Sequence, residues 1–261
     1  MVDSMNATKK TKARVLAVAG KGGAGKTTFA TIMIRLLVNA GQKLLAVDAD
    51  PPISLTYALG AEPDRTVGEM RTRLIEDPGE KRRIGDRHMR DVIREDLVIR
   101  TGNVNLLVLG QAEGAGCFCG LNELLKHGIE SLSGQYDVTV IDCEAGIEQI
   151  NRRVINSIDT LFMVSDPTHK GLRTAVYLDG IARKHGILGQ YRSGLIINRI
   201  DSGVDGLDQK AGELGLEVWG HVPMDRNVAD YDRDGRPTIE LPDNSSSVVA
   251  VREILVRLGI L

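Results

Sequence analysis

The sequence is poor in aromatic residues, in cysteine and in net charge. Phe, Trp and Tyr make up 3% of its 261 residues, which leaves few rings to stack on nucleic acid bases. The formal net charge of −2 provides no basic field that would attract a polyanion. The three cysteines are too few for the disulfide framework of a small secreted protein. We therefore expect no nucleic acid partner.

Long apolar runs are also missing. No segment stays apolar over the roughly 20 residues that a bilayer-spanning helix needs. The N-terminus has no apolar core of the kind found in signal peptides. We expect a cytoplasmic protein with no membrane partner, in which residues 1–12 form a polar tail.

Short apolar runs do occur, and most are followed by a helical pattern. The apolar strand patterns cover 14–20, 43–50, 104–109, 137–142, 159–165, 192–198 and 217–222. The helical patterns cover 27–41, about 121–132, about 147–156, about 171–186 and about 205–215. Alternation of this kind predicts an α/β fold, with a mostly parallel central sheet and helices on both faces. We expect one domain over residues 13–261.

Two segments depart from this alternation. Residues 64–100 are highly charged with helical spacing, which predicts a helical insertion that is either a solvated excursion or a surface for a partner. The C-terminal segment predicts a helix behind a serine N-cap. We expect it to pack on the core, because its polar face lacks the rich basic charge of a membrane-binding helix. Its apolar stripe consists of Val248, Val251, Leu255 and Leu258.

A phosphate-binding motif follows the first strand pattern. Residues 20–27, GKGGAGKT, match GxxxxGK(S/T) between a strand and a helix. Glycines at these positions let backbone N–H groups surround phosphate oxygens, and the following helix N-terminus favours the same anion. We expect Lys26 to reach the β- and γ-phosphates and the Thr27 hydroxyl to bind Mg²⁺.

The lysine at the second position of this loop, Lys21, resembles the deviant Walker A motif. That motif marks the MinD-like (SIMIBI) P-loop ATPases, which include the nitrogenase iron protein, the MinD and ParA positioning ATPases and metal-cluster ATPases. The resemblance implies ATP hydrolysis to ADP with Mg²⁺ in a homodimer. It implies that Lys21 stabilises charge on the partner's nucleotide, as an arginine finger does. The implied nucleotide contacts are Gly22, Gly23, Ala24, Gly25, Lys26, Thr27 and Thr28.

Acidic residues end two of the strand patterns. In VDADPP (47–52), Asp50 resembles the family aspartate that activates the attacking water, and Asp48 is a second carboxylate near Mg²⁺. In VTVIDCEAG (138–146), Asp142 resembles the Walker B aspartate that holds Mg²⁺ through water. Glu144 departs from the family pattern, which has a small residue or proline there.

The resemblance also covers the base site. In LIINRI (195–200), Asn198 resembles the family's adenine-recognising asparagine, and Arg199 follows it. HVPMD (221–225) and RDGRP (233–237) resemble the loop that covers the base, with the backbone of Pro223 in contact with it.

Two of the cysteines, Cys117 and Cys119, stand one residue apart between glycines in GAGCFCG. Such a pair by itself is more typical of small buried residues than of a metal site. In this context it resembles the Cys-x-Cys of CooC-type ATPases, which mature carbon monoxide dehydrogenase. The resemblance implies that a dimer brings four thiolates together around Zn²⁺, Ni²⁺ or a 4Fe–4S cluster. We interpret Cys143 as a small residue at a strand end.

Three functions remain open on this basis. The first is a nickel-inserting metallochaperone for an enzyme that resembles carbon monoxide dehydrogenase. The second is an electron-transfer ATPase with a bridging 4Fe–4S cluster, and the third is a positioning ATPase of the MinD or ParA type. The Cys-x-Cys pattern favours the first, while the net charge and the terminal helix argue against the third.

Overall fold

The computed structural model describes residues 13–63, 65–111, 119–143, 158–184, 192–201 and 206–261. An eight-stranded sheet in the order β3-β4-β2-β5-β1-β6-β7-β8 forms the centre of this described part. Neighbouring strands are parallel, except that β3 is antiparallel to β4. The strands are β1 (Arg14–Gly20), β2 (Leu44–Ala49), β3 (Ile99–Thr101), β4 (Val104–Val108), β5 (Val138–Cys143), β6 (Thr160–Ser165), β7 (Arg192–Ile200) and β8 (Val218–Pro223).

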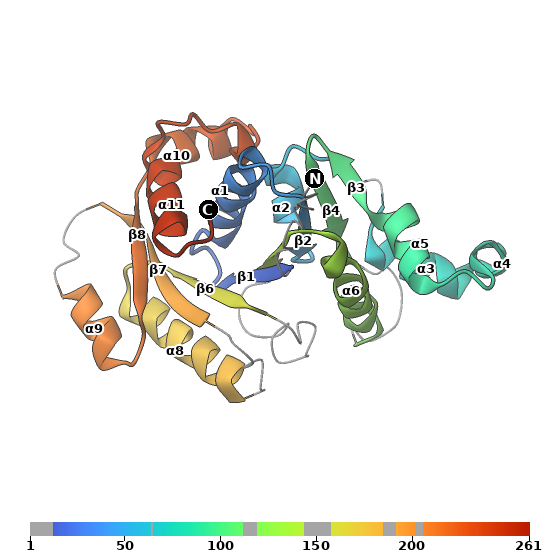
Figure 1. The fold of residues 1–261 in the computed structure, drawn as a ribbon, viewed down its shortest axis with the longest axis horizontal. Coiled ribbons are helices and arrows are strands. Elements are labelled where there is room, and N and C mark those ends of the chain that lie inside the picture. Colours follow the sequence, from blue (N-terminus) through green and yellow to red (C-terminus); the bar gives the residue numbers. More distant parts are fainter. Residues whose placement is uncertain (1–12, 64, 112–118, 144–157, 185–191, 202–205) are drawn as a thin grey trace, which may run out of the picture.

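Helices cover both faces of the sheet (Figure 1), which confirms the predicted α/β fold. One face carries α1 (Lys26–Asn39), α2 (Ser54–Ala58), α10 (Arg226–Arg233) and α11 (Ser246–Arg257). The other carries α6 (Cys119–Leu132), α8 (His169–Lys184) and α9 (Leu207–Glu213). Near β3 lie α3 (Val67–Glu76), α4 (Pro78–Ile84), α5 (Met89–Val92) and the π-helical turn η1 (Ile93–Leu97). Two short 3-10 turns are η2 (Ser133–Gln135) and η3 (Thr238–Glu240).

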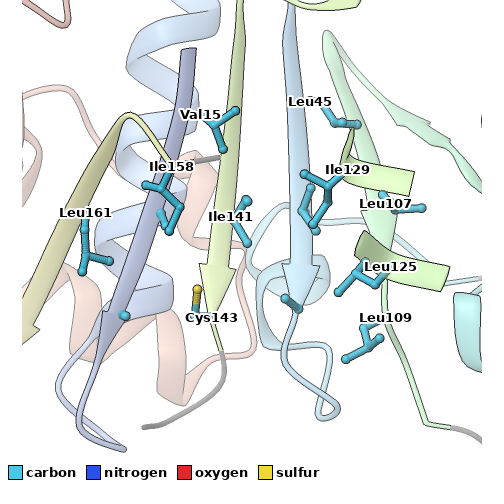
Figure 2. Close-up of a cluster of buried hydrophobic side chains, with 14 of the residues drawn as sticks. Val15, Leu45, Leu107, Leu109, Leu125, Ile129, Ile141, Cys143, Ile158 and Leu161 are labelled. Atoms are coloured by element: carbon cyan, nitrogen blue, oxygen red, sulfur yellow. The ribbon is translucent and has the colours of Figure 1, made fainter. Parts of the chain in front are cut away.

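Two apolar cores lie on the two faces of the sheet. Successive strand residues point to opposite faces, so each buried strand contributes to both cores. Figure 2 shows the core on the α6 side, where Leu125 and Ile129 of α6 lie close to Leu45, Leu107 and other strand residues. Burial of one such aliphatic side chain stabilises the fold by about 1.5–3 kcal/mol. The sheet thus holds its strand ends, where the predicted site residues lie, at fixed positions.

The strand patterns agree with the structure to within about two residues at each boundary. Helix α1 begins and ends one to two residues earlier than predicted, at Lys26 and Asn39. The helix expected at 147–156 and the tail at 1–12 lie outside the described residues.

The charged segment 64–100 contains α3, α4, α5 and η1, but its end is a strand. Residues Ile99–Thr101 pair with β4 as β3, although we expected helical structure at 99–100. Gly102 takes φ 53° in the turn between the two strands, and pairing with a neighbouring strand overrides the local helical pattern. Asp96 accepts from Arg87 at 3.0 Å and lies 3.0 Å from Arg83, which ties α4 to η1.

The terminal helix α11 packs on the core as expected. Val248, Val251 and Leu255 are buried against the α1 side of the sheet. Ser245 occupies the N-cap position, but its hydroxyl donates to Asp225 and accepts no hydrogen bond from a helix N–H group. Within the described residues, no helix is both long enough and apolar enough to cross a membrane.

Candidate nucleotide site

The loop between β1 and α1 adopts a conformation that requires glycine. Gly23 and Gly25 have φ of 75° and 90°, in the left-handed region that side chains disfavour. A Cβ on Gly25 would also lie 2.2 Å from the Asn198 Nδ2 atom. Helix α1 begins at Lys26 with no side-chain cap and no acidic residue in its first turn. Its first N–H groups are therefore available to an anion.

A cavity of about 590 Å³ lies beside this loop, a size that suits a small ligand. The glycine-rich loop and the start of α1 form one part of its lining, and α2 forms another. The third part comes from the end of α10 and the segment up to η3. Residues that line it include Gly22, Gly23, Gly25, Lys26, Thr27, Thr28, Asp50, Tyr57, Arg199, Tyr231, Asp232, Arg236 and Thr238.

Thr27 and Asp142 meet at the base of the site. The Thr27 hydroxyl donates to Asp142 Oδ2 at 2.7 Å. The other oxygen, Oδ1, is buried and has no hydrogen-bond partner among the described residues. A buried carboxylate oxygen without a partner is unfavourable, and a carboxylate beside a hydroxyl is the hard-oxygen donor set that Mg²⁺ prefers. The two residues fit Mg²⁺, which would balance the buried charge.

Electrostatics at this end of the sheet favour a bound cation. Burial raises the pKa of Asp142 to about 7; the Thr27 hydrogen bond opposes this rise and the charge of Asp48 adds to it. Burial likewise raises the pKa of Asp48 to about 6. Asp48 and Asp142 are register partners on β2 and β5, so two carboxylates share one low-dielectric region. A divalent cation there would stabilise the ionised form of both groups.

Asp48 also anchors helix α2. Its Oδ2 atom accepts from the Thr56 backbone N at 2.8 Å and from the Thr56 hydroxyl at 2.7 Å, and both residues are buried. Ile53, at the N-cap of α2, takes φ 53°, which is a strained conformation for a β-branched residue. Asp48 therefore fixes the start of a helix that lines the cavity, while a role for it beside Mg²⁺ stays a prediction.

Asp50 lines the cavity, while its role in positioning water stays a prediction. Partial burial raises its pKa, and the charge of Lys26 opposes the rise. The buried Lys26 side chain lines the same cavity, and its Nζ atom lies 3.4 Å from the Lys21 carbonyl oxygen. A carboxylate and an ammonium group thus both reach the space beside the phosphate loop.

Lys21 is held within its own chain. Its Nζ atom lies 2.8 Å from Asp166 Oδ2, and the two side chains are 31% and 23% exposed. Partial burial alone would raise the pKa of Asp166, but the hydrogen bonds from Lys21 and Thr168 outweigh it and lower the pKa. The pair leaves the Lys21 side chain partly exposed and restricts the position of its ammonium group.

Asn198 and Arg199 contact the phosphate loop itself. Asn198 Nδ2 donates to the Ala24 carbonyl at 2.8 Å, and Arg199 Nη1 donates to the Gly23 carbonyl at 2.8 Å. Arg199 has φ 60°, and the register between β7 and β8 shifts next to it. This irregularity directs two consecutive side chains toward the loop. Because these two side chains bind carbonyl groups of the loop, they leave its N–H groups available to an anion.

A second cavity, of about 380 Å³, lies next to the first. Asn198, Arg199 and Pro223 line it, and apolar side chains such as Phe29 and Val251 contribute much of its wall. Thr28, Arg199, Asp232 and Thr238 line both cavities. An apolar cavity joined to a phosphate loop suits a purine base. Asn198, Arg199 and Pro223, the residues predicted to contact the base, all line this cavity.

The cysteine pair cannot be placed with the same detail. Cys117 lies outside the described residues, and Cys119 begins α6 with a side chain that is not described. Cys143 is buried in the core of Figure 2, where burial raises the pKa of its thiol strongly. Among the described residues, no group of three or more His, Cys, Asp or Glu side chains is placed to hold a metal ion.

Several site residues escape the sequence motifs. Asp166 follows β6 at the same edge of the sheet as Asp48 and Asp142, so its place at a strand end was a usable signal. Arg236 falls within RDGRP (233–237), a motif that predicts the loop over the base. Thr56 and Tyr231 have no comparable signal, because only the folded chain brings them to the site.

Comparison with known proteins assigns this arrangement to a family. A family model described as the CobQ/CobB/MinD/ParA nucleotide binding domain (CbiA) matches residues 15–239. The chain belongs to this family. As a member of the MinD/ParA group it is an ATPase, and the cavity beside its phosphate loop is consistent with binding of a nucleotide and Mg²⁺.

Individual relatives of this MinD/ParA-family ATPase cover nearly its whole length. An uncharacterised ATP-binding protein of Methanocaldococcus jannaschii is 34% identical over 248 residues, 92% of this chain and 96% of the relative. The carbon monoxide dehydrogenase accessory protein CooC of Rhodospirillum rubrum is 30% identical over 240 residues, 87% of this chain and 89% of the relative. The cell division ATPase MinD of Pyrococcus furiosus shares the fold with a TM-score of 0.70 at 23% identity, covering 95% and 98% of the two chains.

Proposed function

We propose that this ATPase is a dimeric metallochaperone that helps to insert nickel into an enzyme resembling carbon monoxide dehydrogenase. The observation that carries the proposal is the 30% identity to CooC, named as an accessory protein of that enzyme, over 87% of this chain. The Cys-x-Cys of the sequence supplies the metal-binding chemistry that such a role needs.

The topology supports a link between the thiols and the nucleotide. Strand β4 runs parallel to β2, and β2 is parallel to β5 and β5 to β1. The loop from β4 to α6 therefore starts at the same edge of the sheet as the phosphate loop. In the sequence Cys117 falls between β4 and α6, and Cys119 begins α6. Metal held there would be close to segments that respond to ATP and Mg²⁺.

A dimer completes both sites in this proposal. One chain supplies two thiolates from Cys117 and Cys119, and a tetrahedral Zn²⁺ or Ni²⁺ site takes about four ligands. A two-fold axis brings a second pair, and it also brings Lys21 of each chain to the nucleotide of the other. Each Lys21 would then stabilise the charge that develops as water, positioned by Asp50, attacks the γ-phosphate of ATP to give ADP and phosphate.

Metal analysis of anaerobically purified protein tests this proposal. We expect about one Zn²⁺ or Ni²⁺ ion per dimer, with a stoichiometry or affinity that changes when ATP is added. The double variant Cys117→Ser, Cys119→Ser should lose this metal and keep nucleotide binding. Cys143→Ala is the matched control, since it removes a buried thiol on the α6 side of the sheet. A double variant that still binds about one metal ion per dimer refutes the proposal.

Two other outcomes would select the competing functions. A brown preparation with iron and sulfide would indicate an electron-transfer ATPase with a bridging 4Fe–4S cluster. A metal-free protein that sediments with lipid vesicles or DNA only when ATP is present would indicate a positioning ATPase, a role that the fold shared with MinD favours.

A further inference from the structure

Arg236 is a cation of the nucleotide cavity that lies outside the phosphate-loop motif. It lines the cavity of about 590 Å³ together with Gly22, Lys26 and Thr27, but it comes from the segment that follows α10. The residue is exposed in the structure, so its guanidinium group is accessible to a ligand in that cavity.

The guanidinium group is already ordered by Tyr231. Its Cζ atom lies 3.8 Å from the centre of the Tyr231 ring, and its Nη2 atom donates to the Tyr231 hydroxyl at 2.8 Å. That hydroxyl donates in turn to the Glu240 carbonyl at 3.1 Å, and the ring is buried in the α1-side core. A guanidinium group has five N–H donors, so most remain available. An ordered arginine loses less side-chain entropy when it binds an anion.

The backbone around Arg236 is fixed as well. Gly235 takes φ 67° after the last turn of α10, and Arg236 N donates to the Tyr231 carbonyl at 2.8 Å. Pro237 packs so closely on the turn after α2 that a Cβ on Gly60 would lie 3.2 Å from it. The segment that carries Arg236 therefore rests against the α2 turn, on the helix that also lines this cavity.

The two cavities indicate which part of a nucleotide Arg236 meets. Residues at their junction, such as Thr28 and Asp232, line both, whereas Arg236 lines only the cavity that contains the phosphate loop. A planar guanidinium group pairs well with phosphate oxygens. We propose that Arg236, held by Tyr231, is a phosphate-binding residue that contacts the phosphate chain of ADP and ATP from outside the loop. This inference concerns the ATPase alone and does not depend on the proposed metal cargo.

Calorimetric titration of the full chain with Mg-ADP and with pyrophosphate tests the proposal. ADP avoids ATP-dependent association, and pyrophosphate has no base or ribose. In Arg236→Ala we expect both affinities to fall about tenfold, the loss typical of one charge-assisted hydrogen bond at a partly exposed site. Arg236→Lys should recover part of the affinity, since the ammonium group keeps the charge but not the planar fork. The matched control is Arg233→Ala, which removes an arginine of the same helix end that pairs with Asp230 and Asp234.

Three results would overturn the assignment. The first is an ADP affinity in Arg236→Ala within twofold of the wild type. The second is an equal loss in Arg233→Ala, which would show a general effect on α10. The third is a loss for ADP without a loss for pyrophosphate, which would place Arg236 at the base or ribose. Thermal unfolding without nucleotide identifies a folding defect, and Arg236→Gln, which keeps the size of the side chain, then replaces Arg236→Ala in both titrations.

Discussion

The buried carboxylate of Asp142 makes the Mg²⁺-free protein sensitive to pH. Its pKa is raised from 3.8 to about 7, a difference of about 3 units. At about 1.36 kcal/mol per unit, this corresponds to about 4 kcal/mol. The folded protein retains a proton that the unfolded chain releases. The stabilisation from that proton is therefore complete below pH 3.8. It is lost progressively as the pH rises from 3.8 to about 7.

Replacing Asp142 by asparagine removes this dependence and keeps an acceptor for the Thr27 hydroxyl. We expect Asp142→Asn to unfold in urea with a free energy about 2 kcal/mol above wild type at pH 5 and about 4 kcal/mol above it at pH 8, without Mg²⁺ or nucleotide. Asp137→Asn, at an exposed residue just before β5, is the control. A free-energy difference that does not grow between the two pH values, or a less stable Asp142→Asn at pH 8, would refute the electrostatic reasoning.

Three further substitutions test individual contacts. Gly25→Ala places a Cβ 2.2 Å from the Asn198 Nδ2 atom in a residue with φ 90°. We expect the unfolding free energy to fall by about 1–3 kcal/mol and ADP binding, measured by calorimetry, to be lost. An ADP affinity within twofold of wild type would contradict this. Asp166→Asn should lower ATPase activity about tenfold, because Lys21 loses its fixed position, while urea unfolding changes by less than about 1 kcal/mol; unchanged activity would contradict the positioning role. Thr56→Val removes the hydroxyl that donates to Asp48. In urea unfolding it should lower the free energy by about 1–3 kcal/mol at pH 8 and by less at pH 5, where Asp48 is more often protonated. An equal loss at both pH values would contradict this reasoning.

The fold follows from the sequence wherever the signal is local. Continuous apolar runs between helical patterns identify buried parallel strands, because burial on both faces leaves no polar alternation. Strand β3 is different: its three residues, Ile99–Thr101, are too few for a pattern of their own, and only pairing with β4 defines them. Its position inside a charged segment with helical spacing led to the wrong prediction for residues 99–100.

The site is predictable in its motif and not in its supporting contacts. The phosphate loop and the strand-end acids are contiguous in sequence, so their chemistry is visible there. The partners Lys21 and Asp166 lie 145 positions apart, and Arg199 and Gly23 lie 176 apart. No local rule links such residues, and the irregularity that directs Arg199 depends on its backbone in the folded sheet.

Strand β5 ends with two neighbouring residues that belong to opposite faces of the sheet. Asp142 bonds to Thr27 at the start of α1, while Cys143 packs in the core that Leu125 and Ile129 of α6 help to build (Figure 2). A displacement of this strand end by a cation on one face is necessarily a displacement of a packed side chain on the other. Protein interiors are closely packed and have little free volume to absorb such movement. Only the backbone of β5 therefore lies between the nucleotide site on one face and the core under α6, the helix that begins at Cys119, on the other.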